Sequence, residues 1–497
     1  MIPGQIRETS PLANGNAAPA PRGRRARNLL AGALLFTGAS QAQTISWNLP
    51  YSRPADYDYT SRYAANMKTY LSVNPDFFKL RLQKAWTFWK ANFLMSNGLV
   101  NHRRLVNNQV VGTNEAVSEG QGYGMLLAVL LNDQATFNKV YEAANSNLWD
   151  GGKKSYRWTW PSGSSGAATD ADLDICLALV FADELVKAKL WQTYNGSASY
   201  NSRAMEIMRS IKANMTASNY LLPGDTWGGD GINNLNPSYF ATAWMKVFNA
   251  YQKEIDWKPV IDNCYAVLAK VPRYNVGQAP DWCNQSGQQA SQGGGKPEQG
   301  LGMLSDGIRV PYRIGMDALW FKDERAIAYC KNTKGTMTEY NNANYAMFAA
   351  QMAQYTKGGT TTTESRGSFD NMAMWMVAIL GSGDLAYSQK GTDSQLFNRL
   401  VGTADTYLGT NELQDDKFYY KQSIAMLGLA ALGGQFPNIQ ADSKVVSILL
   451  APKQARSGSS LENLFGKSGS GWVTTIGISG QAGFRDVLGR SVILTVK

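Results

Sequence analysis

Three acidic residues stand where long loops lead into apolar segments that are expected to be helical. A helix N-terminus tolerates acids because the positive end of the helix dipole favours them, so each position also has an ordinary structural explanation. The three are Glu119 in SEGQGYGMLLAVLL (118–131), Asp170 in AATDADLDI (167–175) and Asp306 in SDGIRVPYR (305–313).

The chain offers few residues for other kinds of chemistry. It has one histidine, His102, and four cysteines, none of which form a CxxC pair. A single histidine excludes most zinc sites and any Ser-His-Asp arrangement built on another position. The sequence therefore predicts no metal and no cofactor, and its chemistry must depend on carboxylates. Cys264 and Cys283 could pair after export, but their spacing does not decide this.

Aromatic residues lie in the loops near these acids. They are Trp158, Trp160, Trp227 and Tyr239. Flat aromatic faces pack against the apolar faces of sugar rings. Glycoside hydrolysis needs one protonated carboxyl group and one carboxylate that acts on water or on the sugar. Carboxylates, aromatic loops and the lack of a usable histidine together favour glycoside hydrolysis.

Helices are expected to position these residues, because apolar residues recur at i, i+3 and i+4 from residue 77 onward, while strand-like alternation is nearly absent. Helices that are apolar almost all round, such as 175–182, belong in an inner layer. The twelve predicted helices are 77–94, 121–131, 135–145, 171–188, 202–215, 239–251, 258–270, 312–330, 342–354, 368–380, 394–408 and 423–432.

Two of the three acids stand next to residues that could cap a helix. Ser118 and Thr169 are expected to cap the helices that follow them with their side chains. The glycines of segment 118–131 have no side chain, so another group can come close to the backbone there, and we expect that group to be a bound sugar. These glycines are Gly120, Gly122 and Gly124.

Long loops alternate with short connections along this helical region. The loops are 146–168, 220–238 and 273–306. Loops of this length inside a domain are usually functional. The alternation predicts helix hairpins stacked around an axis, with the long loops on one face. A helical repeat array is the alternative, although no repeat of fixed period is visible.

The first 42 residues resemble an export signal. Four arginines between 22 and 27 precede the apolar run 29–38, and Ser40-Gln41-Ala42 supplies small residues for cleavage. The apolar run is too short to span a membrane. We therefore expect a secreted bacterial protein, extracellular or associated with the cell surface. A disordered basic tail is the alternative for this segment.

The charge of the remaining chain indicates no nucleic-acid partner. The net charge is +10 in 497 residues, and the leader's five Arg and one Glu leave +6 for residues 43–497. These basic residues are scattered rather than clustered as in nucleic-acid binders. No other segment is apolar and long enough to span a membrane, and we expect a monomer.

The composition changes after residue 439. Residues 440–497 are rich in Ser and Gly, and 471–497 alternates apolar and polar residues in short strand-like runs. We expect three parts: the leader 1–42, a catalytic domain 43–439, and a linker with a C-terminal tail 440–497. The tail is either a secretion or sorting segment or a small β appendage.

Five segments, in order, resemble glycoside hydrolase family 8, which includes bacterial endoglucanases. This resemblance covers about residue 60 to about 437 and implies an all-α (α/α)6 barrel, here with a small Ser/Gly-linked β-like tail. The segments are AVSEGQGYGMLLAVLLND (116–133), ATDADLDICLALVFAD (168–183), NPSYFATAWMKVF (236–248), DGIRVPYRIGMDALW (306–320) and YYKQSIAMLGLAALGG (419–434).

The resemblance implies a role for each acid in an inverting mechanism. Glu119 would be the general acid, Asp306 the general base, and Asp170 would hold and distort the sugar beside the cut. The acid needs a raised pKa to donate a proton near neutrality, so burial or Asp170 must outweigh the helix dipole. Arg309 would stay beside the base and keep it ionised.

The resemblance also implies substrate-binding residues. Tyr239 would position the attacking water, Trp158 and Trp227 would be stacking platforms, and Tyr123 is assigned to substrate binding. The sequence departs from the family around the base, at 305, 307–308 and 312, and carries an unusual insert at 279–298. Substrate contacts there need not follow the family.

The expected function is a secreted, inverting endo-β-1,4-glucanase that acts on cellulose or mixed-linkage β-glucan, as polysaccharide or oligosaccharide. Xylanase and chitosanase activities of the same family are the alternatives. A non-catalytic glycan-binding protein is an alternative of another class, which Glu119 and Asp306 argue against. A uronate-cleaving lyase would want a Tyr/His pair, and the single histidine disfavours it.

Overall fold

The computed structural model describes most of residues 77–441 and four short strands beyond them. The described residues are 77–107, 109–161, 166–226, 231–288, 290, 306–339, 369–382, 417–432, 435–441, 467–468, 471–472, 483–485 and 491–493. The predicted leader 1–42, the predicted helices 342–354 and 394–408, and Trp227 lie outside these residues.

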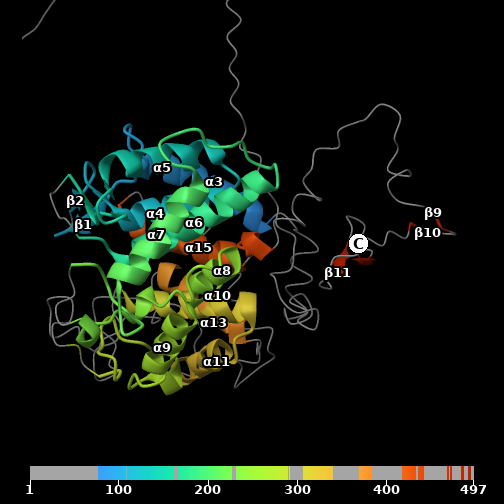
Figure 1. Ribbon diagram of the computed structural model, residues 1–497. Coiled ribbons are helices and arrows are strands. Elements are labelled where there is room, and N and C mark those ends of the chain that lie inside the picture. Colours follow the sequence, from blue (N-terminus) through green and yellow to red (C-terminus); the bar gives the residue numbers. More distant parts are fainter. Residues whose placement is uncertain are drawn as a thin grey trace, which may run out of the picture. The chain divides into compact units, whose positions relative to one another are not determined.

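Helices dominate the described part of the chain (Figure 1). They are α3 (Phe77–Phe93), α4 (Ser118–Leu130), α5 (Gln134–Asn147), α6 (Thr169–Lys187), α7 (Tyr200–Asn214), α8 (Thr242–Tyr251), α9 (Lys258–Leu268), α10 (Val310–Phe321), α11 (Glu324–Glu339), α13 (Phe369–Ser382) and α15 (Tyr419–Leu432). Short 3-10 turns η1 (Gly231–Asn233), η2 (Pro237–Tyr239), η3 (Tyr274–Val276) and η6 (Gly307–Arg309) lie between them.

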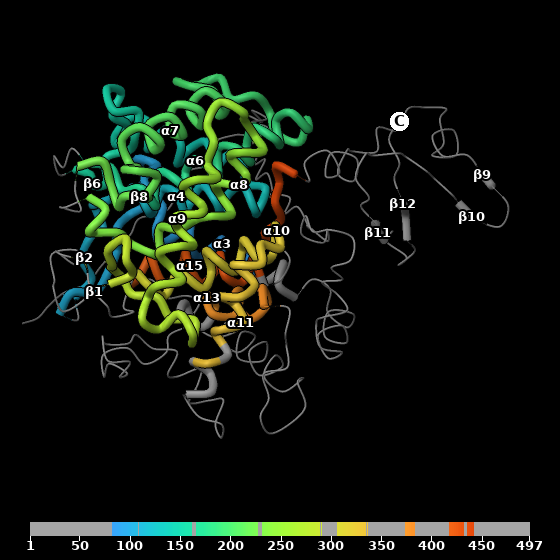
Figure 2. The backbone as a smooth tube through the Cα atoms, turned by 60° about the horizontal axis from the view of Figure 1, so that its bottom comes forward, coloured from blue at the N-terminus to red at the C-terminus, as the bar shows by residue number. Residues whose placement is uncertain are grey.

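Six helices form a closed inner ring. Each packs against the next in the order α4, α6, α8, α10, α13, α15, and α15 packs back against α4. Figure 2 shows α15 beside α13 and α3, elements from distant parts of the sequence. Outer helices cover the ring: α5 lies on α4, α7 on α6, α9 on α8, α11 on α10 and α13, and α3 on α15. The prediction of an (α/α)6 barrel is confirmed.

Burial explains which helices are inner. Every residue of α4 is buried except Glu119, and α10 is buried from Val310 to Trp320. The outer helix α5 buries only one face, since Phe137, Val140 and Tyr141 point inward while other positions stay exposed. An α-helix apolar all round must be surrounded by other elements, as the sequence predicts for 175–182 within α6.

Three of the predicted loops lead into inner helices. The described parts of the loops before α6, α8 and α10 lie at the N-terminal ends of these helices. Short antiparallel strand pairs lie in the segments before α4, α6 and α8. They are β1 (Arg104–Val106) with β2 (Gln109–Val111), β3 (Ala116–Val117) with β6 (Thr159–Trp160), β4 (Trp149–Asp150) with β5 (Ser155–Tyr156), and β7 (Thr216–Ala217) with β8 (Tyr220–Leu221).

One predicted helix is two helices. The segment 312–330 breaks at Lys322, which adopts a left-handed conformation with φ 51°. Asp323 then accepts a hydrogen bond from the backbone N–H of Arg325 at 2.9 Å and so caps the start of α11. The Asp-Glu-Arg sequence after the apolar run is an N-terminal signal that could have revealed this break.

The two predicted side-chain caps are wrong. Helix α4 begins at Ser118 itself, whose backbone N–H donates to Trp158 O at 3.0 Å, while its buried hydroxyl has no hydrogen-bond partner among the described residues. Thr169 also begins its helix, and its hydroxyl donates to Leu222 O at 2.7 Å. Both helix starts are tied to neighbouring loops by backbone carbonyls, so loop contacts take the place of a side-chain cap.

The glycines of α4 face neighbouring protein elements, and the expectation of clearance beside a sugar is wrong. A Cβ on Gly122 would lie 3.0 Å from the Cβ of Asp174 in α6, and one on Gly124 would lie 3.0 Å from Trp89. The glycines therefore let α4 approach α6 and α3 closely.

Beyond residue 441 the structure describes two small antiparallel pairs. They are β9 (Lys467–Ser468) with β10 (Gly471–Trp472), and β11 (Gly483–Arg485) with β12 (Ser491–Ile493). In the barrel, all four cysteines are buried, and none of them forms a disulfide bond among the described residues. No helix among the described residues is long and apolar enough to cross a membrane.

Candidate active site

The predicted site residues meet at the N-terminal ends of inner helices. Glu119 lies in the first turn of α4, Asp170 in the first turn of α6, and Asp306 and Arg309 lie at the two ends of the 3-10 turn η6 that leads into α10. Tyr239 ends the turn η2 just before α8, and Tyr419 is the first residue of α15. Helix N-termini carry partial positive charge, so this end of the barrel suits carboxylates.

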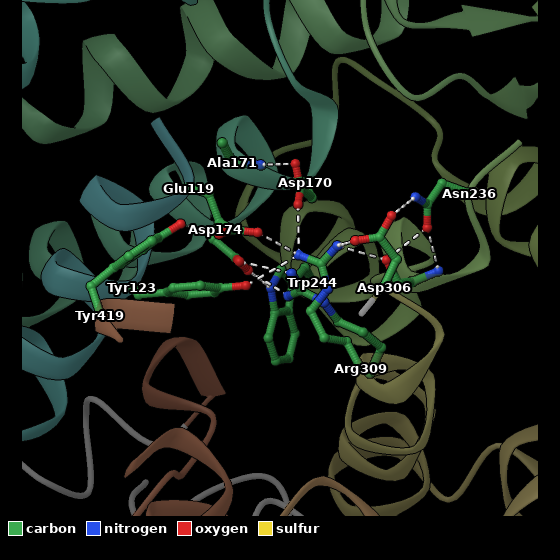
Figure 3. A network of polar contacts seen from close by, with 12 residues as sticks. Glu119, Tyr123, Asp170, Ala171, Asp174, Asn236, Trp244, Asp306, Arg309 and Tyr419 are labelled. Atoms are coloured by element: carbon green, nitrogen blue, oxygen red, sulfur yellow. Dashed lines mark hydrogen bonds and ion pairs between the residues drawn. The ribbon is translucent and has the colours of Figure 1, made fainter. Parts of the chain in front are cut away.

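Arg309 joins the three acids and is 2% exposed at its side chain. Its Nη1 lies 2.8 Å from Glu119 Oε2 and 2.7 Å from Asp170 Oδ2, and its Nη2 lies 3.3 Å from Asp306 Oδ1 (Figure 3). The sequence predicted Arg309 beside the base alone. Its long side chain turns back from η6 into the ring, which brings it to all three acids.

Glu119 is held by both of its carboxyl oxygens. Oε2 accepts from Arg309, and Oε1 accepts from the Tyr419 hydroxyl at 2.5 Å. Burial raises the pKa of Glu119 to about 7, with Asp170 and Asp306 adding to the rise and Arg309 and Tyr419 opposing it. One guanidinium cannot balance three negative carboxylates at this distance, so a proton on Glu119 near neutrality is favoured.

Asp306 is the most accessible of the three acids, with its side chain 29% exposed. Its Oδ2 accepts a hydrogen bond from Asn236 Nδ2 at 2.9 Å. The backbone after it is fixed by buried Asp281, whose Oδ1 accepts from the Gly307 N–H at 2.6 Å. Asp306 is therefore oriented by donors on two sides while part of it stays open to solvent.

Asp170 is buried and faces the same guanidinium. Its other oxygen, Oδ1, accepts from the Ala171 N–H at 2.9 Å. Burial raises the pKa of Asp170, against the opposing effect of Arg309.

Two further aspartates of α6 have partners other than Arg309. Asp172 accepts from the backbone N–H of Tyr156 at 3.1 Å. Asp174 pairs with Arg313, whose Nη2 lies 2.7 Å from Asp174 Oδ2, and also accepts from Trp244 Nε1 at 2.7 Å. Arg313 thus binds α6 rather than Asp306, which it neighbours in sequence. This second ion pair joins α6, α8 and α10.

The predicted substrate-binding residues Tyr239, Tyr123 and Trp158 make different contacts near the acids. Tyr239 stacks against Arg309, whose guanidinium carbon lies 5.4 Å from the ring centroid. The Tyr123 hydroxyl lies 3.1 Å from Arg309 Nη1 in the core. Trp158 is 41% exposed, and its carbonyl pairs with Ser118, the residue before Glu119. Tyr239 and Tyr123 thus contact the arginine that binds the acids, whereas Trp158 reaches the start of α4 through its backbone.

Tyr419, Asn236 and Ser238 belong to this network, and sequence reasoning assigned them no role. All three lie in segments that resemble the family, 236–248 and 419–434. A tyrosine or asparagine has no spacing that marks it as a partner of an acid from a distant segment. Only the closure of the ring brings Tyr419 to α4.

Among the described residues, no group of three or more His, Cys, Asp and Glu side chains could hold a metal ion. The three acids instead share Arg309.

The family model of the glycosyl hydrolases family 8 matches residues 30–430 of this chain. The chain belongs to glycosyl hydrolases family 8. It is therefore a glycoside hydrolase, and members of this family invert the configuration at the cleaved carbon. All three acids and Arg309 lie within the matched residues.

Curated relatives in family 8 carry endoglucanase names. The chain is 33% identical to Endoglucanase A of Acetivibrio thermocellus over 375 residues, covering 73% of this chain and 70% of the relative. It is 31% identical to Endoglucanase 2 of Ruminiclostridium josui over 370 residues, covering 72% of each chain.

Solved family 8 structures share the fold. A β-1,3-1,4-glucanase from Paenibacillus sp. X4 superposes with a TM-score of 0.58 at 21% identity, covering 80% of this chain and 97% of that one. A cold-adapted family 8 xylanase gives a TM-score of 0.58 at 19% identity, covering 79% and 98%. At this identity the likeness concerns the fold alone.

Proposed function

We propose that this chain is an inverting endo-β-1,4-glucanase with Glu119 as general acid and Asp306 as general base. The observation that carries the proposal is the shared guanidinium of Arg309, which contacts both acids through different nitrogens. The guanidinium lies between the two carboxyl groups (Figure 3). An inverting enzyme needs about 6.5–9.5 Å between them to admit a water.

The reaction follows from the protonation of the two acids. Asp306 takes a proton from a water molecule as the water oxygen attacks the anomeric carbon of the sugar. The bond from that carbon to the glycosidic oxygen breaks, and Glu119 gives its proton to the leaving oxygen. The new C–O bond forms on the opposite face of the ring, so a β-linked substrate gives an α-product.

Supporting groups have distinct tasks in this proposal. Asp170, buried beside Arg309, holds and distorts the sugar next to the cut. Tyr239 helps position the water, and exposed Trp158 offers a stacking face beside the acid. Arg309 binds all three carboxyl groups and offsets the repulsion between them.

The substrate proposed is cellulose or mixed-linkage β-glucan. The endoglucanase names of the relatives that are about a third identical support it. Product analysis on cello-, xylo- and chitosan oligomers tests the sugar: cleavage of xylo- or chitosan oligomers in preference to cello-oligomers would contradict the proposal.

Stereochemistry tests the mechanism. Proton NMR of freshly formed product should show the α-anomer first, before mutarotation. Asp306→Asn should lose activity by about 10²–10⁴-fold, the usual contribution of a general base, with an unchanged circular dichroism spectrum. Product that first appears as the β-anomer, or near-normal turnover in Asp306→Asn, would overturn the assignment.

The proposal includes export and a single-chain enzyme. We propose that residues 1–42 are an export signal cleaved after Ala42, that 43–439 is the catalytic domain, and that 440–497 is a linker with a C-terminal tail. N-terminal sequencing of protein from the culture medium and light scattering of the purified enzyme test this. Mature protein that retains residues 1–42, or a mass by light scattering that corresponds to a dimer, would contradict the proposal.

A further inference from the structure

Asn236 lies on the opposite side of Asp306 from Arg309. Its Nδ2 donates to Asp306 Oδ2 at 2.9 Å, while Arg309 Nη2 lies 3.3 Å from Asp306 Oδ1. Asn236 is 1% exposed and precedes the turn η2. Figure 3 shows Asn236 facing Asp306, away from Glu119 and Tyr419.

The orientation of the Asn236 amide is fixed by its other end. Its Oδ1 accepts from the backbone N–H of Ser238 at 3.0 Å and lies 2.7 Å from the Ser238 hydroxyl. A backbone N–H can only donate, so the atom that faces it must be the amide oxygen rather than the amide nitrogen. The nitrogen must then face Asp306, and a flipped amide would lose contacts on both sides.

Ser238 links this amide to Arg309. The Ser238 hydroxyl accepts from Arg309 Nη2 at 2.8 Å and has one hydrogen to give, which goes to Asn236 Oδ1. The contacts run from Arg309 through Ser238 and Asn236 to Asp306, and Arg309 also contacts Asp306 directly. Asp306 is thus held at both oxygens by donors that are themselves fixed.

We infer that Asn236, anchored by Ser238, is the positioning residue that orients Asp306 toward the attacking water. This inference rests on the proposed role of Asp306 as general base. An N–H at Oδ2 leaves the remaining lone pairs of the carboxylate to accept the proton from water.

Asn236→Asp is the sharpest test, because it keeps an acceptor toward Ser238 and replaces only the donor that faces Asp306. Two carboxylate oxygens about 3 Å apart disfavour ionisation of both. A base must be ionised to act, so the acid limb of the pH profile of kcat/KM should move to higher pH by about one unit or more. Asn236→Ala should lower kcat by roughly tenfold to a hundredfold through misplacement of the base, with KM changed little.

Other titratable groups near Asp306 are unchanged in these variants. They are Arg309 from η6, Asp281 at the Gly307 N–H, Tyr239 from η2, Asp170 from α6 and Glu119 from α4. A shift of the acid limb is therefore attributable to position 236. Asn249→Ala is the matched control, since it removes an amide oxygen in α8 that accepts from the backbone N–H of Trp257 at 2.9 Å. The pH profile of this variant should match that of the wild type.

The measurement is kcat and KM on a soluble cello-oligosaccharide from pH 4 to 9 for each folded variant. Ser238→Ala removes the hydroxyl anchor but leaves Asn236, and we expect a smaller loss of kcat with a shift of the limb in the same direction. If the acid limb of Asn236→Asp lies at the same pH as in the wild type, the inference is wrong. If that variant does not fold, an unchanged acid limb in Ser238→Ala overturns the inference instead. Near-normal activity of Asp306→Asn would instead refute the proposed function itself.

Discussion

The Tyr419 hydroxyl donates to Glu119 Oε1 at 2.5 Å, although 300 positions separate the two residues. Tyr419 begins the last described inner helix, and α4 is the first in the ring. The contact therefore depends on closure of the barrel. The Tyr419 ring makes an edge-type contact with the His102 ring, with the ring centroids 5.4 Å apart. The backbone N–H of Tyr419 also donates to Arg103 O at 3.1 Å.

Tyr419→Phe should move the alkaline limb of activity upward. The hydrogen bond from Tyr419 lowers the pKa of Glu119, so its loss raises that pKa and the acid keeps its proton to higher pH. A hydrogen bond to a charged group contributes about 1.5–3 kcal/mol, which corresponds to about one to two pH units. The pH profile of kcat/KM measures this. Tyr329→Phe, which removes a buried hydroxyl bound to Gly277 O, is the control and should leave the limb in place.

Glu119→Gln should abolish most hydrolysis and leave binding of oligosaccharide largely intact. General acid catalysis contributes about 10²–10⁴-fold, and glutamine cannot donate the required proton. In the wild type a pKa of about 7 predicts that kcat/KM falls as pH rises through 7, because the acid must be protonated to act. Release of reducing ends from carboxymethylcellulose and calorimetric binding of a cello-oligosaccharide measure the two effects.

Glu115→Gln is the matched control for that substitution. Glu115 is half exposed and pairs with Arg104 at 3.1 Å, outside the site. Its variant should keep wild-type activity and the fall above pH 7. If Glu119→Gln retained near-normal turnover, the acid would have to be another residue.

Arg309→Lys should inactivate the enzyme and lower its stability despite keeping the charge. An ammonium group cannot contact Glu119, Asp170 and Asp306 together in the fork geometry of a guanidinium. Breaking a buried ion pair by removing one partner costs about 3–5 kcal/mol. We expect a fall in kcat/KM of at least about a hundredfold and a lower midpoint of urea unfolding. Wild-type values of kcat/KM and of the urea midpoint in this variant would show that the shared guanidinium is dispensable.

Arg313→Met should affect stability far more than substrate binding. The pair between Arg313 and Asp174 is buried and joins three inner helices, and it lies apart from the contacts that Arg309 makes with the three acids. Leaving Asp174 unpaired should lower the free energy of unfolding by about 3–5 kcal/mol. Urea denaturation and KM measured on the folded fraction check this. The double variant Arg313→Met, Asp174→Leu should recover part of the loss; a large change in KM with unchanged stability would contradict the structural role.

Part of the site followed from the sequence because it depends on local pattern. Glu119, Asp170 and Asp306 each precede an apolar helical segment, and that pattern alone is enough to predict acids at helix starts. The break at Lys322 was missed because periodicity continues across it, since both flanking helices bury apolar faces. The caps at Ser118 and Thr169 failed because tertiary contacts with loop carbonyls took the place of local partners.

By itself, the sequence determined the helical class, the inner helices and the chemistry available, since a chain with one histidine and acids at helix starts must work mainly through carboxylates. Tertiary structure decided which groups meet. Arg309 turns into the ring to reach three acids, Tyr419 reaches Glu119 only when α15 packs on α4, and Arg313 binds Asp174 instead of nearby Asp306. Burial depends on every neighbour at once, and it raises the pKa of Glu119 even though the helix dipole favours the ionised form. Such contacts and desolvation depend on distance in space, which residue spacing along the chain does not encode.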